Sequence, residues 1–185
     1  MGSATKHRVV LVSGPPGAGK TTLARPLAGR LGFALLTKDD IKETLYTAMG
    51  GERGDVEFSR RVGAAAMELL WALAPQCPRV VLEANFRTQS EYERGKVEGL
   101  IAGETEVVEV YCRVSRDEAS RRFAERARGE RLHPAHALAE MAPERMAEYE
   151  EPFALGPVIE VDTARPVDVE GLVEKVERAW KAEEV

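Results

Sequence analysis

A glycine-rich segment behind an apolar, β-branched run constrains the fold of this chain more than any other feature. Residues 14–22 (GPPGAGKTT) match the pattern G-x-x-x-x-G-K-[ST]. The preceding run, Arg8–Ser13, is typical of a buried parallel strand, and Leu23, Leu27 and Leu31 recur at helical spacing behind it. Glycines in such a segment let backbone N–H groups surround phosphate oxygens at the start of a helix. The pattern therefore predicts a phosphate-binding loop between a strand and a helix.

We expect this loop to bind Mg·ATP. The ammonium of Lys20 would reach the β- and γ-phosphates, and the hydroxyl of Thr21 would ligate Mg²⁺. The expected ATP-binding residues of the loop are Gly14, Pro15, Pro16, Gly17, Ala18, Gly19, Lys20, Thr21 and Thr22. The alternative is a glycine-rich turn that binds nothing. Average residue usage produces the full pattern in only roughly one window in ten thousand, which disfavours that alternative.

Apolar runs alternate with helix-periodic segments along the whole chain, as in a parallel sheet wrapped by helices. The expected strands are Arg8–Ser13, Phe33–Thr37, Arg79–Ala84, Val107–Cys112 and Val158–Val161. No internal repeat or low-complexity linker interrupts the pattern. We therefore predict an α/β fold with a five-stranded parallel sheet in a single domain, residues 1–185.

Composition limits the partners. The 26 Lys and Arg residues against 31 Asp and Glu give a formal charge of −5, which argues against a general nucleic-acid binder. No apolar run is long enough to span a membrane, and the polar N-terminus does not resemble a secretory signal, so a cytoplasmic protein is expected. Cys77 and Cys112 fit no zinc or disulfide spacing and are expected to be buried free thiols. His133 and His136 lack further ligands in the sequence and predict no metal site.

The phosphate-binding loop alone does not distinguish a kinase from a GTPase or a motor ATPase. The sequence lacks an Asn-Lys-x-Asp segment for guanine and is short for a motor ATPase with its lid domain. Asp39 and Asp40 follow the second predicted strand, whose carboxyl end lies on the same side of the sheet as the loop. We expect Asp39 to accept the proton of an attacking hydroxyl and Asp40 to cap the next helix, although either could be the cap.

An arginine cluster predicts a small helical lid at about residues 115–137. Ser115-Arg116-Asp117-Glu118 is a capping-box signature for a helix after the fourth strand. The cluster that follows contains Arg121, Arg122, Arg126, Arg128 and Arg131. Arg122 and Arg126 share one helix face, and arginines on a closing lid would neutralise charge on the transferring phosphoryl group. The alternative for each arginine is an ordinary solvated helix face.

Residues after the third and fifth strands are candidates for the acceptor and adenine sides of the site. Asn85 would hydrogen-bond the acceptor and Arg87 would pair with an anionic group on it, unless this segment is only a capped turn. Arg60 and Arg61 lie on a helix that often walls the acceptor pocket in such folds, and at least one of them is expected to be exposed at the surface instead. Thr163 and Arg165 lie in the loop 162–166 after the fifth strand, which is also expected as a plain turn that caps the last helix.

With these motifs placed, the chain resembles the small P-loop kinases, which include polynucleotide 5′-kinase domains, chloramphenicol phosphotransferase and the zeta-toxin sugar-nucleotide kinases. The resemblance rests on the phosphate-binding loop, on the segment 38–42 (KDDIK) and on the segment 83–86 (EANF). It implies the P-loop NTPase fold of nucleotide kinases. It also implies that Asp39 is the general base, that Lys42 contacts the acceptor, and that Arg122 and Arg126 are the lid arginines. In the kinases that the chain resembles, the loop 162–166 runs past the adenine.

Two positions depart from the pattern of that family. Glu83 stands where aspartate is usual, which leaves a role in the metal shell or in acceptor binding open. Lys42 stands where the nucleic-acid kinases have arginine, which weakens bidentate recognition of phosphate. The resemblance therefore implies the reaction type more strongly than the substrate.

We predict an ATP-dependent phosphotransferase that acts on a hydroxyl of a small molecule such as a sugar, a nucleoside or an antibiotic. Its catalytic residues would be Lys20, Asp39, Arg122 and Arg126. The predicted substrate-binding residues are Asp39, Lys42, Arg60, Glu83, Asn85 and Arg87. The alternatives are a polynucleotide 5′-hydroxyl kinase, a nucleotide-sugar kinase of the zeta-toxin type, and a regulatory ATPase without an acceptor. The sequence does not indicate an oligomeric state.

Overall fold

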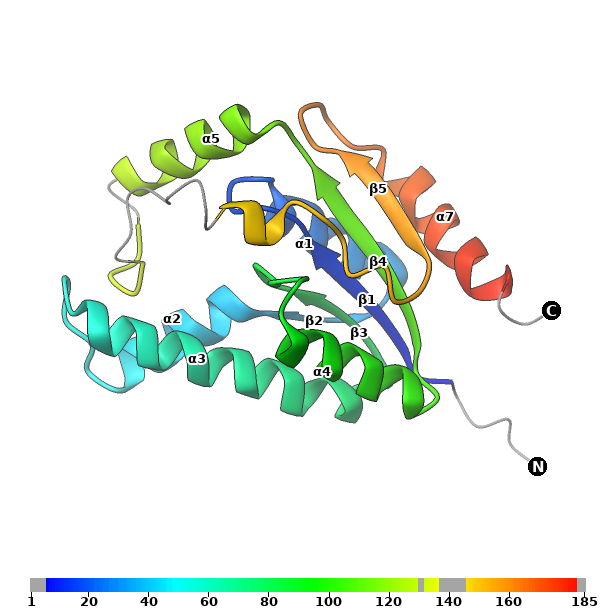
Figure 1. The fold of residues 1–185 in the computed structure, drawn as a ribbon, viewed down its shortest axis with the longest axis horizontal. Helices are drawn as coiled ribbons and strands as arrows, with labels where there is room; N and C mark the ends of the chain where they lie inside the picture. Colours follow the sequence, from blue (N-terminus) through cyan, green and yellow to red (C-terminus); the bar gives the residue numbers. More distant parts are fainter. Residues whose placement is uncertain (1–5, 130–131, 137–145, 183–185) are drawn as a thin grey trace.

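A parallel sheet forms the centre of the molecule. The structure, a computed structural model, describes residues 6–129, 132–136 and 146–182. The five strands lie in the order β2-β3-β1-β4-β5 (Figure 1). They are β1 Arg8–Ser13, β2 Ala34–Thr37, β3 Arg79–Glu83, β4 Glu106–Arg113 and β5 Val158–Asp162. Every predicted strand is present with its bounds shifted by no more than one residue, and the predicted fold class is confirmed.

Helices connect the strands. They are α1 Lys20–Leu31, α2 Lys38–Ala48, α3 Val56–Leu73, α4 Glu91–Ala102, α5 Arg116–Arg128 and α7 Val169–Ala182. Short 3₁₀ turns lie at Ala74–Gln76 and Ala147–Tyr149. None of the helices in the described ranges is both long and apolar enough to cross a membrane.

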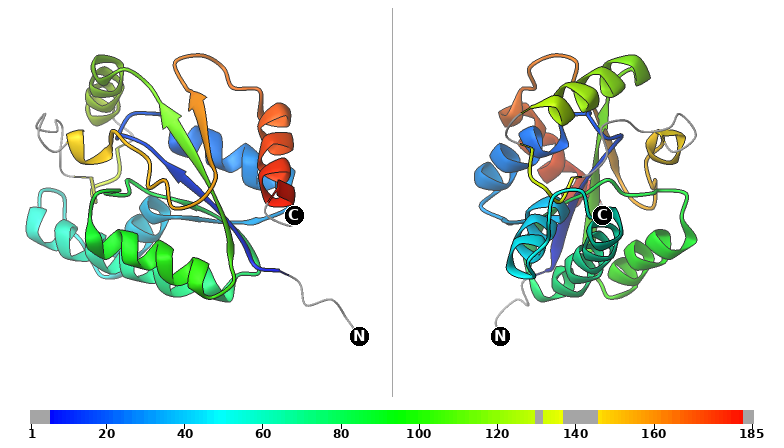
Figure 2. Two further views of the ribbon diagram at one scale, coloured as in Figure 1. Left: turned by 45° about the vertical axis from the view of Figure 1, so that its right-hand side comes forward. Right: turned by 90° about the vertical axis from the view of Figure 1, so that its left-hand side faces the viewer.

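Both faces of the sheet are buried, which explains the continuous apolar runs in the sequence. Val10 and Val12 of β1 pack in one core with α1 and α7. Val9 and Leu11 alternate with them and pack in the other core with α3 and α4 (Figures 1 and 2). Because successive side chains of a strand point to opposite faces, a central strand between two helical layers must be apolar at every position.

The carboxyl ends of the strands define the side of the molecule where the site forms. α2 begins directly after β2, and the hydroxyl of Thr37 caps it by accepting a hydrogen bond from the backbone N–H of Asp40 at 3.1 Å. The expectation that Asp40 itself caps this helix is therefore wrong. The Ser115 hydroxyl accepts from the N–H of Glu118 at 3.3 Å, as the capping signature predicts, and α5 then crosses above the strand ends (Figure 2).

The two cysteines differ in burial. Cys112 lies in β4 against the start of the phosphate-binding loop and is fully buried, and burial raises the pKa of its thiol to about 12. Cys77 precedes β3 at the end of a 3₁₀ turn and is partly exposed. The prediction of two buried thiols is therefore right for Cys112 and wrong for Cys77.

Candidate active site

The phosphate-binding loop connects β1 to α1 in the conformation that its glycines permit. Gly17 and Gly19 have φ values of 87° and 77°, in the left-handed region that favours glycine. A Cβ on Gly19 would meet nothing within 4 Å, so the loop is open there at the N-terminus of α1. The free N–H groups of a helix N-terminus attract anions. The loop thus has the geometry of a phosphate cradle.

Gly17 also lets the lid helix approach the loop closely. A Cβ on Gly17 would lie 2.1 Å from the carbonyl oxygen of Ala119 and 3.2 Å from the backbone N of Phe123, both in α5. These are backbone atoms of a helix and cannot yield as a flexible side chain does. α5 therefore rests directly on the phosphate-binding loop.

Replacing Gly17 with alanine is expected to destabilise the protein, because the left-handed backbone and the collision with α5 act together. We expect a loss of about 2 kcal/mol or more, which lowers Tm by about 4–8 °C. Gly95→Ala is the control: Gly95 lies in α4 with nothing within 4 Å of an added Cβ, and alanine there should stabilise by up to about 1 kcal/mol. Thermal unfolding of both variants checks this. Equal Tm values for Gly17→Ala and the parent chain would contradict the close packing.

Lys20 begins α1 and lies beneath the loop. Its Nζ donates hydrogen bonds to the carbonyl oxygens of Gly14 and Pro15, both at 2.9 Å. Burial lowers the pKa of Lys20, and the nearby negative charge of Glu83 opposes that shift. The ammonium is thus held at the base of the cradle, and the carboxylate of Glu83 makes the largest contribution among the nearby negative charges.

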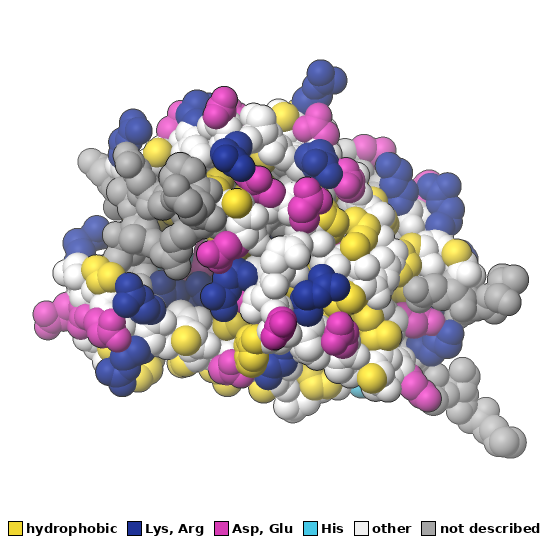
Figure 3. All heavy atoms as spheres, viewed as in Figure 1, with side chains coloured by type: hydrophobic (Ala, Val, Ile, Leu, Met, Phe, Trp, Pro, Cys, Tyr) yellow, Lys and Arg dark blue, Asp and Glu magenta, His cyan; other side chains and the backbone are white. Residues whose placement is uncertain are grey.

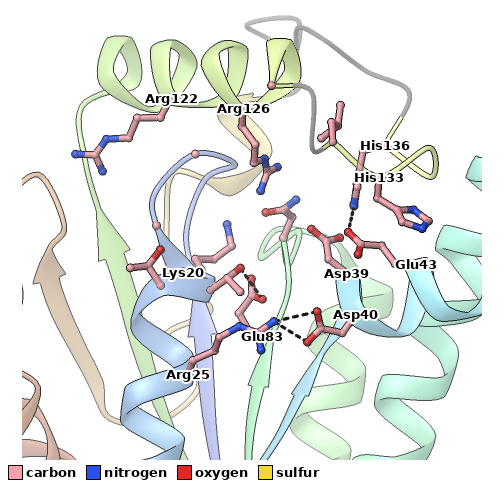
Figure 4. A pocket seen from close by; sticks show the side chains of 17 residues that line it. Lys20, Arg25, Asp39, Asp40, Glu43, Glu83, Arg122, Arg126, His133 and His136 are labelled. Carbon is pink, nitrogen blue, oxygen red and sulfur yellow. Dashed lines mark hydrogen bonds and ion pairs between the residues drawn. The ribbon is translucent and has the colours of Figure 1, made fainter.

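Thr21 and Glu83 supply adjacent oxygen atoms between β3 and the loop. The Thr21 hydroxyl donates to Glu83 Oε2 at 3.1 Å (Figure 4). Burial raises the pKa of Glu83, while the charge of Lys20 lowers it. Hydroxyl and carboxylate oxygens suit Mg²⁺, which proteins often bind through one or two such ligands together with substrate phosphates. The described residues contain no cluster of three or more His, Cys, Asp or Glu side chains that could hold a metal ion without help from the substrate. This donor set fits Mg²⁺ bound with a nucleotide.

Asp39 and Asp40 play different parts in the structure. Asp40 forms a bidentate ion pair with Arg25 of α1, with both N–O distances at 3.0 Å. Asp39 points into the pocket, with Lys38 Nζ at 3.4 Å from its Oδ1 (Figure 4). Burial alone would raise the pKa of Asp39, but the positive charge of Lys38, with smaller contributions from His136 and Arg126, lowers it. Asp39 is therefore ionised at neutral pH and available as a hydrogen-bond acceptor.

The lid helix α5 directs two of its arginines to the site. Arg122 donates to Glu118 Oε1 at 2.6 Å and to the carbonyl oxygen of Thr163 at 3.0 Å. Arg126 points down into the pocket toward Asp39 (Figure 4). Arg121 is paired with Glu118 and Glu125 on the exposed face of the helix.

The remaining arginines of the cluster do not reach the pocket in the described structure. Arg128 is exposed and is not among the residues that line it. Arg131 and the predicted end of the lid at residue 137 lie outside the described residues. The predicted pair, Arg122 and Arg126, is thus the part of the cluster that the fold brings to the phosphate-binding loop.

A smaller pocket of about 250 Å³ adjoins the loop on the β5 side. Gly19, Thr22 and Arg122 line it on one side, and Thr163 and Arg165 on the other. The loop after β5 thus lies beside the phosphate-binding loop, where the sequence predicts contact with adenine.

Three of the predicted acceptor-binding cations have other partners. Lys42 is buried, and its Nζ donates to Ser59 Oγ at 2.9 Å and to the carbonyl oxygen of Ala135 at 2.7 Å. Burial lowers the pKa of Lys42 to about 8. Arg87 pairs with the buried Glu93 at 3.1 Å, and the exposed Arg60 lies beside Glu57 at 3.3 Å. Glu83 and Asn85, which the sequence also predicts as substrate-binding residues, both line the main pocket.

Four further residues line the main pocket that the sequence does not predict as site residues: Arg25, Glu43, His133 and His136. Glu43 lies one helical turn after Asp39, so the i, i+4 spacing could have placed both on one face of α2. The histidines could not be placed from the sequence, because the segment 132–136 reaches α2 only in the fold. His136 Nε2 lies 2.7 Å from Glu43 Oε1, and His133 Nε2 lies 3.1 Å from Thr47 Oγ1.

Comparisons with known proteins agree with this geometry. A family model described as an AAA domain (AAA_33) matches residues 9–151. A cytidylate kinase from Ignicoccus hospitalis is 28% identical over 124 residues, which make up 64% of each chain. The match thus spans less than two thirds of that relative's length.

Solved structures share the whole fold. A protein of Chloroflexus aurantiacus j-10-fl, assigned as a kinase, has a TM-score of 0.79 and 28% identity, with 95% of this chain and 99% of that chain covered. Shikimate kinase from Acinetobacter baumannii, solved with shikimate, has a TM-score of 0.58 and 20% identity, with 98% and 96% covered. The second likeness concerns the fold alone. The fold is that of the P-loop NTPases.

Proposed function

Since the chain belongs to this AAA-domain family, we propose that it is an ATP-dependent kinase that transfers the γ-phosphoryl group of ATP to a hydroxyl of a small molecule. Similarity to proteins named or assigned as kinases supports phosphoryl transfer. One observation carries most of the proposal: Lys20 and the ionised Asp39 line the same pocket of about 750 Å³. A cation for phosphate and a carboxylate for the acceptor are the two groups that such a transfer requires.

In the proposed reaction, the acceptor oxygen bonds to the γ-phosphorus and the bond from phosphorus to the β–γ bridging oxygen breaks, so that ADP leaves. Asp39 orients the acceptor hydroxyl and takes its proton. Lys20, Arg122 and Arg126 neutralise the charge on the oxygens of the phosphoryl group. Such a site works mainly through positioning and charge, so Asp39 needs no raised pKa.

Thr21 and Glu83 would hold Mg²⁺ against the nucleotide, and the bound ion would supply charge neutralisation on the β- and γ-phosphates. Burial raises the pKa of Glu83, and a bound cation would lower this pKa and favour the ionised carboxylate. On the other side of the loop, the pocket at Thr163 and Arg165 would take adenine.

The charge distribution favours a small acceptor over a polynucleotide end. On the face drawn in Figure 3, Lys and Arg side chains of the described residues are interspersed with Asp and Glu over most of the surface. Proteins that bind nucleic-acid backbones gain affinity from continuous basic surfaces. A small-molecule acceptor is therefore the first choice. The alternatives are polynucleotide 5′-hydroxyl phosphorylation, nucleotide-sugar phosphorylation and regulatory ATP hydrolysis.

The proposal is tested by measuring ATP consumption with Mg²⁺ across nucleosides, sugars, nucleotide sugars, hydroxylated antibiotics, 5′-hydroxyl oligonucleotides and nucleoside monophosphates. We expect one class of hydroxyl compound to stimulate turnover and to give a phosphorylated product by mass spectrometry. Fast hydrolysis that no acceptor changes would favour the regulatory ATPase. A product phosphorylated only on an existing phosphate, as in a cytidylate acceptor, would contradict the hydroxyl acceptor.

A further inference from the structure

The acceptor side of the pocket has few cations to offer. A site for an anionic acceptor would need at least one arginine or lysine free to face it. The three cations nearest to that role, Lys42, Arg60 and Arg87, are held by Ser59 and Ala135, by Glu57 and by Glu93, as described above. None of the three lines the main pocket. These three side chains therefore form contacts within the protein and do not face the acceptor.

The cations that do line or adjoin the pocket are either paired with a carboxylate or placed where the nucleotide would bind. Arg25 is paired with Asp40, and Lys38 lies beside Asp39. Lys20 and Arg122 serve the loop and the smaller pocket, where the nucleotide would sit. Arg126 would be required by the phosphoryl group itself. Of the two histidines that line the pocket, His136 is bonded to Glu43 and His133 to Thr47. Within the described ranges, this leaves no lysine or arginine of the pocket for a second anion.

Glu43 adds negative charge where the acceptor would lie. It is one turn beyond Asp39 on α2, points into the pocket, and has a side chain that is 38% exposed (Figure 4). Its Oε1 is bonded to His136, and no described residue binds its Oε2. An anionic group placed next to Asp39 and Glu43 would meet two like charges, while a hydroxyl or an ammonium would find an acceptor oxygen.

We propose that the acceptor carries no anionic group, that it is a neutral polyol or an amino alcohol, and that Glu43 binds it and discriminates against anionic alcohols. This inference rests on the kinase function proposed above and narrows its substrate class. It also distinguishes this site from one that would take a nucleoside monophosphate.

The test uses acceptors that differ in charge and little else. Three matched sets are glucose, glucosamine and glucuronate; glycerol, 2-amino-1,3-propanediol and glycerate; and cytidine with cytidine 5′-monophosphate. Phosphorylated product is measured for each, and protection against thermal unfolding is measured with a non-hydrolysable ATP analogue present. We expect kcat/KM and protection to be at least about tenfold lower for the anionic members.

The outcomes separate the two proposals. Transfer to an anionic member as efficient as to its neutral partner would overturn the charge inference and still support the kinase. Protection by neutral or cationic members without any product would support the inference and count against the kinase. Equal protection across each set, including no protection by any member, would overturn the inference.

Glu43→Gln removes the charge and keeps the size of the side chain. We expect the ratio of kcat/KM for neutral to anionic acceptors to fall by about tenfold, mainly through KM for the anionic member. Glu57→Gln makes the same change on the exposed surface of α3, beside Arg60, and should leave the ratio unchanged. A ratio that stays constant in Glu43→Gln, or that falls equally in both variants, would overturn the assigned role of Glu43.

Discussion

Replacing Asp39 with asparagine is expected to lower kcat by about 10²–10⁴-fold and to change ATP affinity by less than about threefold. Asparagine keeps the size of the side chain, but it has no negative charge and cannot take the proton of the acceptor hydroxyl. The pocket places Asp39 beside Lys38 and across from the loop, and α2 begins independently of it through the Thr37 cap. Steady-state kinetics together with ATP binding by calorimetry would measure both effects.

The matched control is Asp40→Asn, one residue away on the same helix. Asp40 also lines the pocket, but it is paired with Arg25 and its side chain is 53% exposed, so its loss should change kcat by only a few fold. The two variants therefore show which of the two aspartates acts as the general base, a choice that the sequence alone leaves open. Substantial activity in Asp39→Asn, or an equal loss in Asp40→Asn, would show that the base is assigned to the wrong residue.

Replacing Lys20 with alanine should act on the nucleotide complex itself and weaken ATP binding by about 10–100-fold, since a charge-assisted hydrogen bond to phosphate is lost. It also leaves Glu83 without its nearest counter-charge, so the pKa of Glu83, already raised by burial, should rise further. Mg²⁺-dependent binding should then weaken in parallel.

Calorimetric titration with ATP, with and without Mg²⁺, measures the loss. Lys175→Ala on the exposed surface of α7 is the control, and it should bind ATP as the parent chain does. Thermal unfolding of Lys20→Ala shows whether the fold is retained, because removing a buried charge need not destabilise it. An unchanged ATP affinity in a folded Lys20→Ala protein would contradict the role of this lysine.

Much of the fold could be predicted from local pattern. The strands are apolar because both faces of the sheet are covered, and this signal does not depend on which helix covers them. The order β2-β3-β1-β4-β5 could not be derived in that way, because it depends on how the connections cross the sheet. The phosphate-binding loop was predictable because its glycine spacing is a requirement of backbone conformation.

Side chains whose partners are distant in the sequence were harder to predict. Lys42 looked like an acceptor ligand, but it is buried against Ser59 and the carbonyl oxygen of Ala135, which lies 93 positions away. Arg87 was expected to face the acceptor, and Glu93 holds it instead from the first turn of α4. Such contacts depend on which elements meet in the fold. Glu43, in contrast, could be predicted, because its spacing from Asp39 places both side chains on one face of α2.

The order of the strands places the two sides of the candidate site on different halves of the sheet. The residues proposed for the acceptor side, such as Asp39, Glu43 and Asn85, follow β2 and β3, whereas Thr163 and Arg165 follow β5 at the opposite edge. The phosphate-binding loop follows β1, which lies between them. Under the proposed function, substitutions in the β2–β3 half would change the acceptor, whereas the half with β1 and β5 would continue to bind the nucleotide. A chimaera that joins the β2–β3 half of one such protein to the remaining half of another at β1 would be expected to take the acceptor specificity of the first.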